Sequence, residues 1–219
     1  MMMHLTPQMY RMARQIALAL VAVLVFFVGI GAYKWYAHRY EEKAHKTFAR
    51  ALDIYDQAAG AQGDAKTALI DRAYDMFEKT ASTYSRSSYA PLCGLYQAQI
   101  KLDKGDAVTA QDMLKSALSR MPRHTFLTDL YTIKRALLMT DSDADDIRAT
   151  GEKILTEYVA DKKSAFRDMA LFYLGKLKYD ALDYDGACTF WDPLIKEFGS
   201  DDKTSNWARR ALDLKEYRA

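Results

Sequence analysis

The sequence predicts an all-α protein in which one apolar helix precedes a solenoid of helical hairpins. Residues 16–33 form a run of 18 residues without a charged side chain. After this run, apolar side chains recur at three- and four-residue intervals, which is the period of a helix. The chain has only four prolines and lacks the alternating, β-branched pattern that is typical of strands.

The charge-free run predicts an N-terminal transmembrane helix. At about 1.5 Å of rise per residue its length is about 27 Å, close to the ~30 Å hydrocarbon core of a bilayer. Arg11 and Arg14 precede it, and the cluster Tyr33-Lys34-Trp35-Tyr36 at its end supplies aromatic and cationic groups at headgroup depth. We therefore predict four segments: a short tail at 1–15, a transmembrane helix at 16–33, a helical stalk at 34–59 and a domain of repeated helical hairpins at 60–219.

A cleaved signal peptide or a buried core helix explains the same run less well. The apolar part of a signal peptide usually has about 7–15 residues, and the best cleavage site here, Ile30-Gly31-Ala32, begins with a bulky residue. A core helix carries its apolar residues on one face, whereas this run is apolar all round. An uncleaved anchor is the better explanation.

The remaining segments are predicted as helices in chain order. Apolar side chains continue at helical spacing from Tyr36 to Ala59, and Gly60 and Gly63 then interrupt the pattern. A helix follows at about 65–84, and Ser87 or Ser88 caps the next helix, which has Pro91 in its first turn. Three helix pairs come next, 89–104 with 107–121, 126–139 with 144–159, and 164–181 with 184–198, and a last helix at about 203–217 closes the array.

The helix pairs repeat with a period of about 34–40 residues, and units of this kind must stack because one pair cannot bury its own apolar face. In 91–122 the second helix has a small-large-small-proline pattern, carried by Gly105-Asp106, Ala110, Leu114, Ala117 and Pro122, which is similar to that of a tetratricopeptide repeat (TPR). In the unit from Arg167 the matching positions are Leu171, Leu174, Gly175, Ala187 and Trp191. The chain therefore resembles a TPR array across about 44–215. Residues 126–160 match mainly by spacing, and Pro193 departs from the pattern because it removes a helical hydrogen bond.

The order of the segments is similar to that of the YfgM-type family of ancillary subunits of the bacterial SecYEG translocon. The resemblance rests on the basic tail, the single span with its aromatic and basic end, the stalk, the serine-rich stretch 84–90, and 183–187 followed by Trp191. It implies a single-pass protein of the bacterial inner membrane with a cytoplasmic N-terminus and a periplasmic C-terminal domain. It also implies a scaffold role, with SecYEG and a membrane-anchored periplasmic prolyl-isomerase-like chaperone as partners.

Charge counting favours a different topology. Two Arg precede the span, whereas five basic residues follow it closely: Lys34, Arg39, Lys43, Lys46 and Arg50. Counted literally, the positive-inside rule keeps the domain in the cytoplasm, although large domains cross a membrane largely regardless of flanking charge. A cytoplasmic membrane-anchored regulatory adaptor therefore stays an alternative, as does a scaffold for envelope or outer-membrane assembly with the same fold.

Composition and motifs give no support for nucleic-acid binding, catalysis, a cofactor or a metal. The tail and span contain two Arg and no acid, so the rest of the chain carries 29 basic residues against 29 acidic ones. The histidines His4, His38, His45 and His124 lack a cysteine or carboxylate at metal or nucleophile spacing. Asp141 to Asp146 suggest a calcium loop, but Asp146 stands where such a loop needs a glycine. We predict a protein that is not an enzyme.

The two cysteines, Cys93 and Cys188, lie in predicted helices among small apolar residues and lack metal-ligand spacing. The simplest expectation is therefore buried free thiols. A periplasmic location would permit a disulfide between them without requiring one.

The TPR resemblance also predicts a partner-binding surface. The first helix of each TPR unit lines a concave groove, and apolar or amphipathic side chains there can receive an extended or helical segment of a partner. Packing against the neighbouring helix is the simpler role for several of these side chains. Because the array lacks a clustered Lys/Arg clamp, we expect mainly apolar, low-affinity recognition. The predicted groove residues are Leu92, Leu95, Gln99, Leu102, Met169, Phe172, Lys176 and Tyr179.

Overall fold

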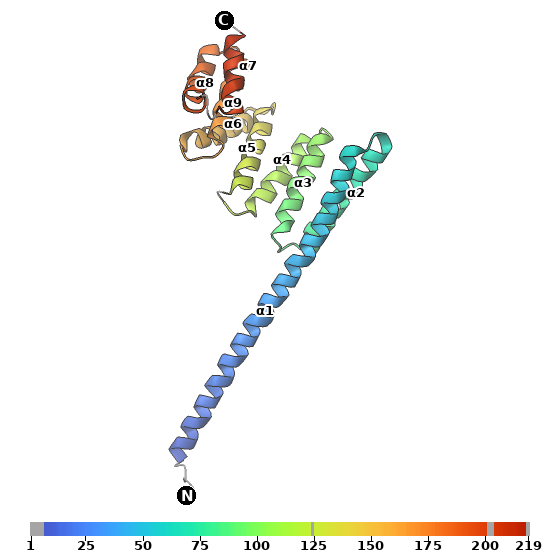
Figure 1. Cartoon of the computed structure of the whole chain (residues 1–219), viewed down its shortest axis with the longest axis vertical. Helices are drawn as coiled ribbons and strands as arrows, with labels where there is room; N and C mark the ends of the chain where they lie inside the picture. Colours follow the sequence, from blue (N-terminus) through green and yellow to red (C-terminus); the bar gives the residue numbers. More distant parts are fainter. Residues whose placement is uncertain (1–6, 124, 201–203, 218–219) are drawn as a thin grey trace. The chain divides into compact units, whose positions relative to one another are not determined.

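The computed structural model is all-α and describes residues 7–123, 125–200 and 204–217, with side chains given for Leu20 and from Val23 onward. Within these ranges nine helices pack as sequential hairpins (Figure 1), which confirms the predicted class and hairpin order. The chain divides into two compact units at Ala90–Pro91. The helices are α1 (Pro7–Gly60), α2 (Gly63–Thr83), α3 (Tyr89–Asp103), α4 (Ala107–Ser119), α5 (Phe126–Thr140), α6 (Asp145–Ala160), α7 (Arg167–Asp180), α8 (Tyr184–Phe198) and α9 (Asn206–Glu216).

The first helix, α1, is a continuous helix of 54 residues. Its backbone includes the predicted span at 16–33 and the predicted stalk at 34–59, whereas residues 1–6 of the predicted tail lie outside the described part of the chain. In the part of the chain that the structure describes, no helix combines the length and the apolar character that a membrane crossing needs. Within the predicted span the side chains at 16–19, 21 and 22 are not described, and the span stays a prediction.

The second half of α1 forms an antiparallel hairpin with α2. Ala44, Ala51 and Ala58 are 0%, 0% and 2% exposed. Their seven-residue spacing is close to two helical turns, so they lie on one face, where their small side chains let α2 approach closely. Aromatic pairs flank this seam, with ring centroids 5.8 Å apart for Phe48 and Phe77. The predicted stalk is therefore one side of a packed hairpin.

Hydrogen bonds tie the turn at 84–88 to α1. Glu41 accepts hydrogen bonds from the Ser88 backbone N–H at 3.1 Å and from its hydroxyl at 3.0 Å. The Tyr40 hydroxyl donates to the Thr83 carbonyl at 3.3 Å. Ser87 Oγ accepts from the Tyr89 N–H at 3.1 Å, so of the two serines Ser87 is the one that binds the first N–H of α3.

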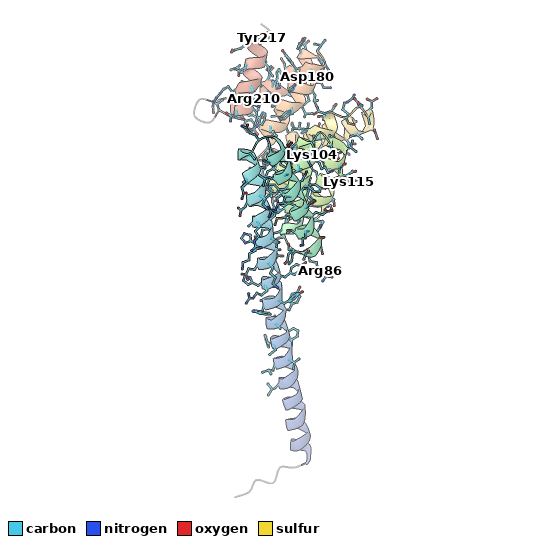
Figure 2. All side chains as sticks on the ribbon, turned by 90° about the vertical axis from the view of Figure 1, so that its right-hand side faces the viewer. Arg86, Lys104, Lys115, Asp180, Arg210 and Tyr217 are labelled. Carbon is cyan, nitrogen blue, oxygen red and sulfur yellow. The ribbon has the colours of Figure 1, made fainter. Side chains whose placement is uncertain are left out.

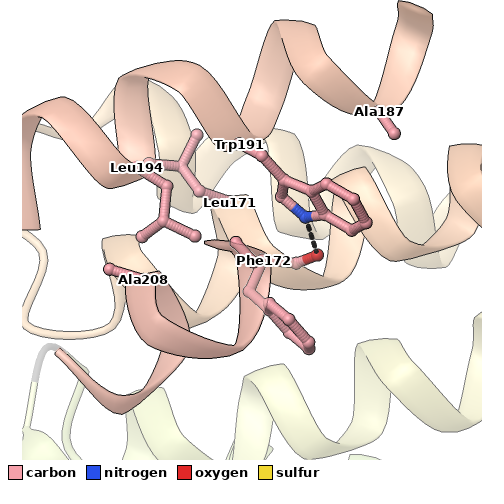
Figure 3. Close-up of a cluster of buried hydrophobic side chains, with 7 residues drawn as sticks. Leu171, Phe172, Ala187, Trp191, Leu194 and Ala208 are labelled. Carbon is pink, nitrogen blue, oxygen red and sulfur yellow. Dashed lines mark hydrogen bonds between the residues drawn. The ribbon is translucent and has the colours of Figure 1, made fainter. Parts of the chain in front are cut away.

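Residues 91–217 form three hairpins, α3–α4, α5–α6 and α7–α8, followed by α9, and their buried cores follow one another along the chain. The first core contains Leu95, Ala98, Ala110, Leu114 and Ala117. The second contains Ile133, Ala136, Leu155, Phe166, Ala170 and Leu174. The third, part of which Figure 3 shows, contains Leu171, Phe172, Ala187, Trp191, Leu194, Ala208 and Ala211. Because α7 contributes to both the second and the third core, neighbouring hairpins stabilise one another, as in a solenoid.

One glycine stands at the closest approach of the helices in each of these three hairpins. A Cβ on Gly94 would lie 3.2 Å from the Ala117 Cβ, and one on Gly151 would lie 2.6 Å from the Ala136 carbonyl oxygen. A Cβ on Gly175 would overlap the indole of Trp191. That indole donates from Nε1 to the Phe172 carbonyl at 3.1 Å inside the third core (Figure 3).

Replacing Gly175 with Ala should destabilise the third core, because the added methyl group displaces the buried Trp191 ring. Overpacking of this kind costs about 2–3 kcal/mol. Urea unfolding of the purified chain, followed by tryptophan fluorescence, measures the change. The matched control is Gly60→Ala, since nothing lies within 4 Å of a Cβ at Gly60. Equal stability of the two variants would contradict the close contact between Gly175 and Trp191.

Two inter-helix turns share one design. Gly105 and Leu182 both have positive φ, at 79° and 61°. Each is followed by an aspartate that caps the next helix: Asp106 accepts from the Thr109 N–H at 3.2 Å, and Asp183 accepts from the Gly186 N–H at 2.9 Å. Glycine adopts positive φ without a Cβ clash, whereas leucine does so at a conformational cost. Leu182 is also 72% exposed, so it gains little from burial at this strained position.

Leu182→Gly should therefore stabilise the protein by about 0.5 kcal/mol, because relief of a left-handed leucine outweighs the extra flexibility of glycine in the unfolded chain. The matched reverse change, Gly105→Ala, should destabilise it by about 1 kcal/mol. Midpoints of thermal unfolding of the two variants should move in opposite directions. A loss of stability in Leu182→Gly would show that the leucine side chain has a packing role.

Candidate partner-binding groove

The structure places the eight predicted groove residues in the first helices of two hairpins, mostly against the cores. Leu95 and Phe172 are 2% and 5% exposed, so their side chains belong to the first and third cores. Leu92 and Leu102 pack against the first core, Met169 against the second and Tyr179 against the third. Packing therefore accounts for these six apolar and aromatic side chains.

The two polar members of the predicted set are half-buried and bonded within their own helices. Gln99 donates from Nε2 to Asp103 Oδ1 at 2.9 Å. Lys176 forms an ion pair with Asp180 at 2.5 Å. Contact of the partly exposed members with a partner stays a prediction.

A groove of about 860 Å³ opens where α5 begins and α6 ends. These two helix ends lie side by side because the helices form a hairpin (Figure 1). The turn between α6 and α7 completes the walls. The residues that line the groove are Arg123, Phe126, Thr128, Asp129, Thr132, Ile154, Glu157, Tyr158, Asp161, Lys163, Ser164 and Ala165.

The α5 wall is positioned by a network of threonine hydroxyls. Thr125 caps α5 by accepting from the Thr128 N–H at 3.3 Å, and the Thr128 hydroxyl donates to the Pro122 carbonyl at 2.8 Å. This arrangement places Phe126 in the first turn of the helix, where it is 68% exposed. One side of its ring contacts Phe166, with centroids 4.9 Å apart. Phe126 is thus a large aromatic side chain held in position with most of its surface open.

The opposite wall is positioned by contacts at the turn between α6 and α7. Arg167 is buried, donates from Nε to the Val159 carbonyl at 2.9 Å and forms an ion pair with Glu197. The carbonyl near the end of α6 thereby gains a partner that the helix cannot supply. Asp161 Oδ1 accepts from the Lys163 N–H at 2.9 Å, which fixes the turn.

A hydrogen bond joins the two helices along the groove. The Tyr158 hydroxyl on α6 donates to Asp129 Oδ1 on α5 at 2.9 Å. Burial raises the pKa of Tyr158, and the hydrogen bond to the Asp129 carboxylate raises it further. Tyr158 therefore stays neutral and remains a donor at physiological pH. The bond keeps the two walls at a fixed separation.

The groove combines apolar and charged groups of both signs. Phe126 and Ile154 supply apolar surface, Arg123 and Lys163 are basic, and the lining also contains Asp129, Glu157 and Asp161. An exposed aromatic anchor surrounded by polar groups is the usual composition of a protein-interaction site. The geometry therefore favours binding of a peptide segment whose apolar side chain covers Phe126.

Sequence reasoning did not identify this groove. Residues 126–160 match the TPR pattern mainly by spacing. The pattern therefore did not predict which side chains in this range face a partner. An aromatic residue at helical spacing also normally predicts a core position. The sequence signal for its exposure is that Phe126 directly follows the cap Thr125. It is therefore the first residue of the helix, at the end that adjoins the preceding loop.

Neither the aspartate cluster nor the cysteines form a chemical centre in the described residues. Asp141 caps the end of α5, Asp145 pairs with Arg148 at 3.1 Å, and no group of three or more His, Cys, Asp or Glu in the described ranges could hold a metal ion. His4 and His124 lie outside those ranges. Cys93 and Cys188 are free, and burial raises the pKa of the Cys93 thiol to about 12, so this thiol stays protonated.

Comparison with known families assigns the fold. The model of the tetratricopeptide repeat-like domain matches residues 10–146, from the first part of α1 to the start of α6. The chain belongs to this family, whose repeats are protein-binding scaffolds and are usually non-catalytic. No curated protein matches the chain.

Replacing Phe126 with Ala should weaken peptide binding about tenfold or more, since a central aromatic anchor typically contributes about 2 kcal/mol. Peptides selected from a random phage-displayed library on the purified chain provide the probe, and their affinities are measured by fluorescence anisotropy. Val108→Ala is the control, because Val108 is 77% exposed but lies on α4, outside the groove lining. Equal losses in both variants, or none in Phe126→Ala, would contradict the assignment of the groove.

Proposed function

We propose that this protein is a membrane-tethered TPR scaffold of the bacterial inner membrane. In this proposal it acts as an ancillary subunit of the SecYEG translocon and links the channel to a membrane-anchored periplasmic prolyl-isomerase-like chaperone. The family assignment supports a role in protein binding. The resemblance of the segment order to YfgM-type subunits supports the choice of partners.

The observation that carries the tether is the apolar surface of α1 before the hairpin. Leu20, Val23, Leu24, Val25, Phe26, Phe27 and Val28 are all between 51% and 66% exposed. Leaving apolar surface in water costs about 25 cal/mol per Å², so such a surface needs an apolar environment. A helix that exposes apolar side chains all round suits lipid, because its backbone groups are bonded internally.

The residues after this surface have the character of a membrane interface. Tyr33, Trp35 and Tyr36 are 73%, 64% and 63% exposed, and the Arg39 guanidinium lies 5.6 Å from the centre of the Trp35 ring. Aromatic and basic side chains of this kind are enriched at headgroup level. They support a span that ends near Tyr33.

Tethering explains how a groove that binds its partner weakly can remain occupied. Confinement of scaffold and partner to one membrane raises their effective concentration, so a weak peptide interaction becomes sufficient. No chemical step is needed for this role. The scaffold supplies position, and its partners supply the activity.

The proposed orientation has a cytoplasmic N-terminus and a periplasmic repeat domain. Protease treatment of spheroplasts expressing the full chain tests it, and we expect the C-terminal domain to be degraded before lysis. The five basic residues after the span favour the opposite orientation, that of a cytoplasmic regulatory adaptor. A domain that stays protected until lysis would support that adaptor and contradict the proposal.

The proposed partner is tested by crosslinking from the groove. A photo-reactive amino acid at Phe126 in the full chain should capture SecYEG subunits or the periplasmic chaperone, whereas the same group at Val108 should not. Capture of barrel-assembly components from Phe126 would instead favour a scaffold for outer-membrane assembly. Capture of channel subunits from both positions would contradict a role for the groove.

A further inference from the structure

The turn at 84–88 lies about one helical turn beyond the exposed aromatic cluster of α1. It is fixed there by three contacts with α1: the Tyr40 and Tyr84 rings are 5.3 Å apart, the Tyr40 hydroxyl donates to Thr83, and Glu41 accepts from Ser88. Tyr36 precedes Tyr40 by four residues, which corresponds to about 6 Å along the helix. Since α1 is continuous through this region, the separation between the aromatic cluster and the turn is fixed.

This separation matches the thickness of a headgroup layer. A bilayer is about 40–45 Å thick with headgroups and about 30 Å without them, which leaves about 5–8 Å on each side. Aromatic side chains occupy the boundary between hydrocarbon and headgroups. If Tyr33 and Tyr36 lie at that boundary, the turn at 84–88 lies within or directly above the phosphate groups.

Exposed basic side chains lie at this end of the hairpin. Arg86 in the turn and Lys43 on α1 are exposed, and the Arg39 side chain is 58% exposed. Figure 2 shows Arg86 at the end of the hairpin that is closer to the start of α1. Guanidinium groups bind phosphate oxygens in a bidentate geometry, and basic residues near an anionic leaflet are attracted to it.

The acidic groups at the same level already have partners. Glu41 accepts both hydrogen bonds of Ser88, and Glu42 pairs with Lys46 at 2.8 Å and with Arg39 at 3.9 Å. Both carboxylates hold the turn and the helix together and keep their negative charge. Four basic groups, Arg39, Lys43, Lys46 and Arg86, outnumber them at this end of the hairpin and leave it with a net positive charge. A ligand complementary to this positive charge is the singly charged phosphate group of a phospholipid, many of which lie side by side in a membrane surface.

We propose that Arg39, Lys43 and Arg86 form a binding site for the phosphate groups of anionic phospholipids, which seats the α1–α2 hairpin on the membrane surface. The proposal rests on the membrane anchor described under the proposed function. Its consequence is that the height of the hairpin above the bilayer is fixed by lipid contacts as well as by the helix.

Fluorescent probes on the full chain in liposomes test the proposal. Single cysteines for labelling replace Thr83 beside the turn, Val25 in the anchor, and Asp64 at the other end of α2, about 29 Å from Thr83 along the helix. Cys188→Ser removes the accessible native thiol, and Cys93 is buried. The liposomes contain phosphatidylcholine alone or with phosphatidylglycerol, together with a lipid that carries a nitroxide quencher on its headgroup.

We expect strong quenching at Thr83 and little at Asp64, with at least twofold stronger quenching at Thr83 when phosphatidylglycerol is present. Arg86→Gln combined with Arg39→Gln should abolish that increase. The control Lys66→Gln removes a positive charge at the far end of α2 and should leave the increase in quenching unchanged.

The outcomes separate this proposal from the anchor on which it rests. In these experiments an acyl-chain quencher reports on Val25. Quenching of Val25 without quenching of Thr83, or quenching of Thr83 that ignores both phosphatidylglycerol and the arginine substitutions, would overturn the lipid site and leave the anchor intact. An unquenched Val25 probe would overturn the anchor and the lipid site together.

Discussion

A helical hairpin of this size cannot bury its apolar face alone, and successive hairpins in residues 91–217 therefore share their cores. α7 makes this dependence visible, because Leu174 belongs to the second core and Leu171 to the third. The helices approach closely where Gly94, Gly151 and Gly175 leave room for a neighbouring side chain or carbonyl. Each hairpin is thus stabilised by the next one along the chain. The groove at the ends of α5 and α6 is held in place by packing against the hairpins on both sides.

The same construction is consistent with the proposed function, in which the protein positions its partners. Side chains inside the cores are committed to packing, so partner contact is left to the hairpin ends, where Phe126 is exposed beside the bonded pair of Tyr158 and Asp129. A groove of mixed polarity binds weakly on its own. In our account the apolar part of α1 compensates by holding the scaffold in the same membrane as its partners.

Much of the fold could be predicted because its determinants are local. Asp106 and Asp183 cap helices directly after turn residues, and Gly175 and Trp191 occupy recognisable repeat positions. The binding surface could not be predicted in the same way. Helical spacing alone does not distinguish a face that packs from one that lines a groove. It therefore predicted groove positions for Leu95 and Phe172, which are buried in the cores. The exposure of Phe126 depends on how the α4–α5 connection and the α6–α7 turn fold around it.

The proposed function depends on lipid covering the apolar surface of α1. Alkaline carbonate extraction of membranes from cells that make the full chain measures this most directly, because it removes peripheral proteins and leaves inserted helices in the bilayer. We expect the full-length, uncleaved chain to sediment with the membranes after extraction. Recovery of the chain in the supernatant, or of a mature form shortened near Ala32, would contradict it.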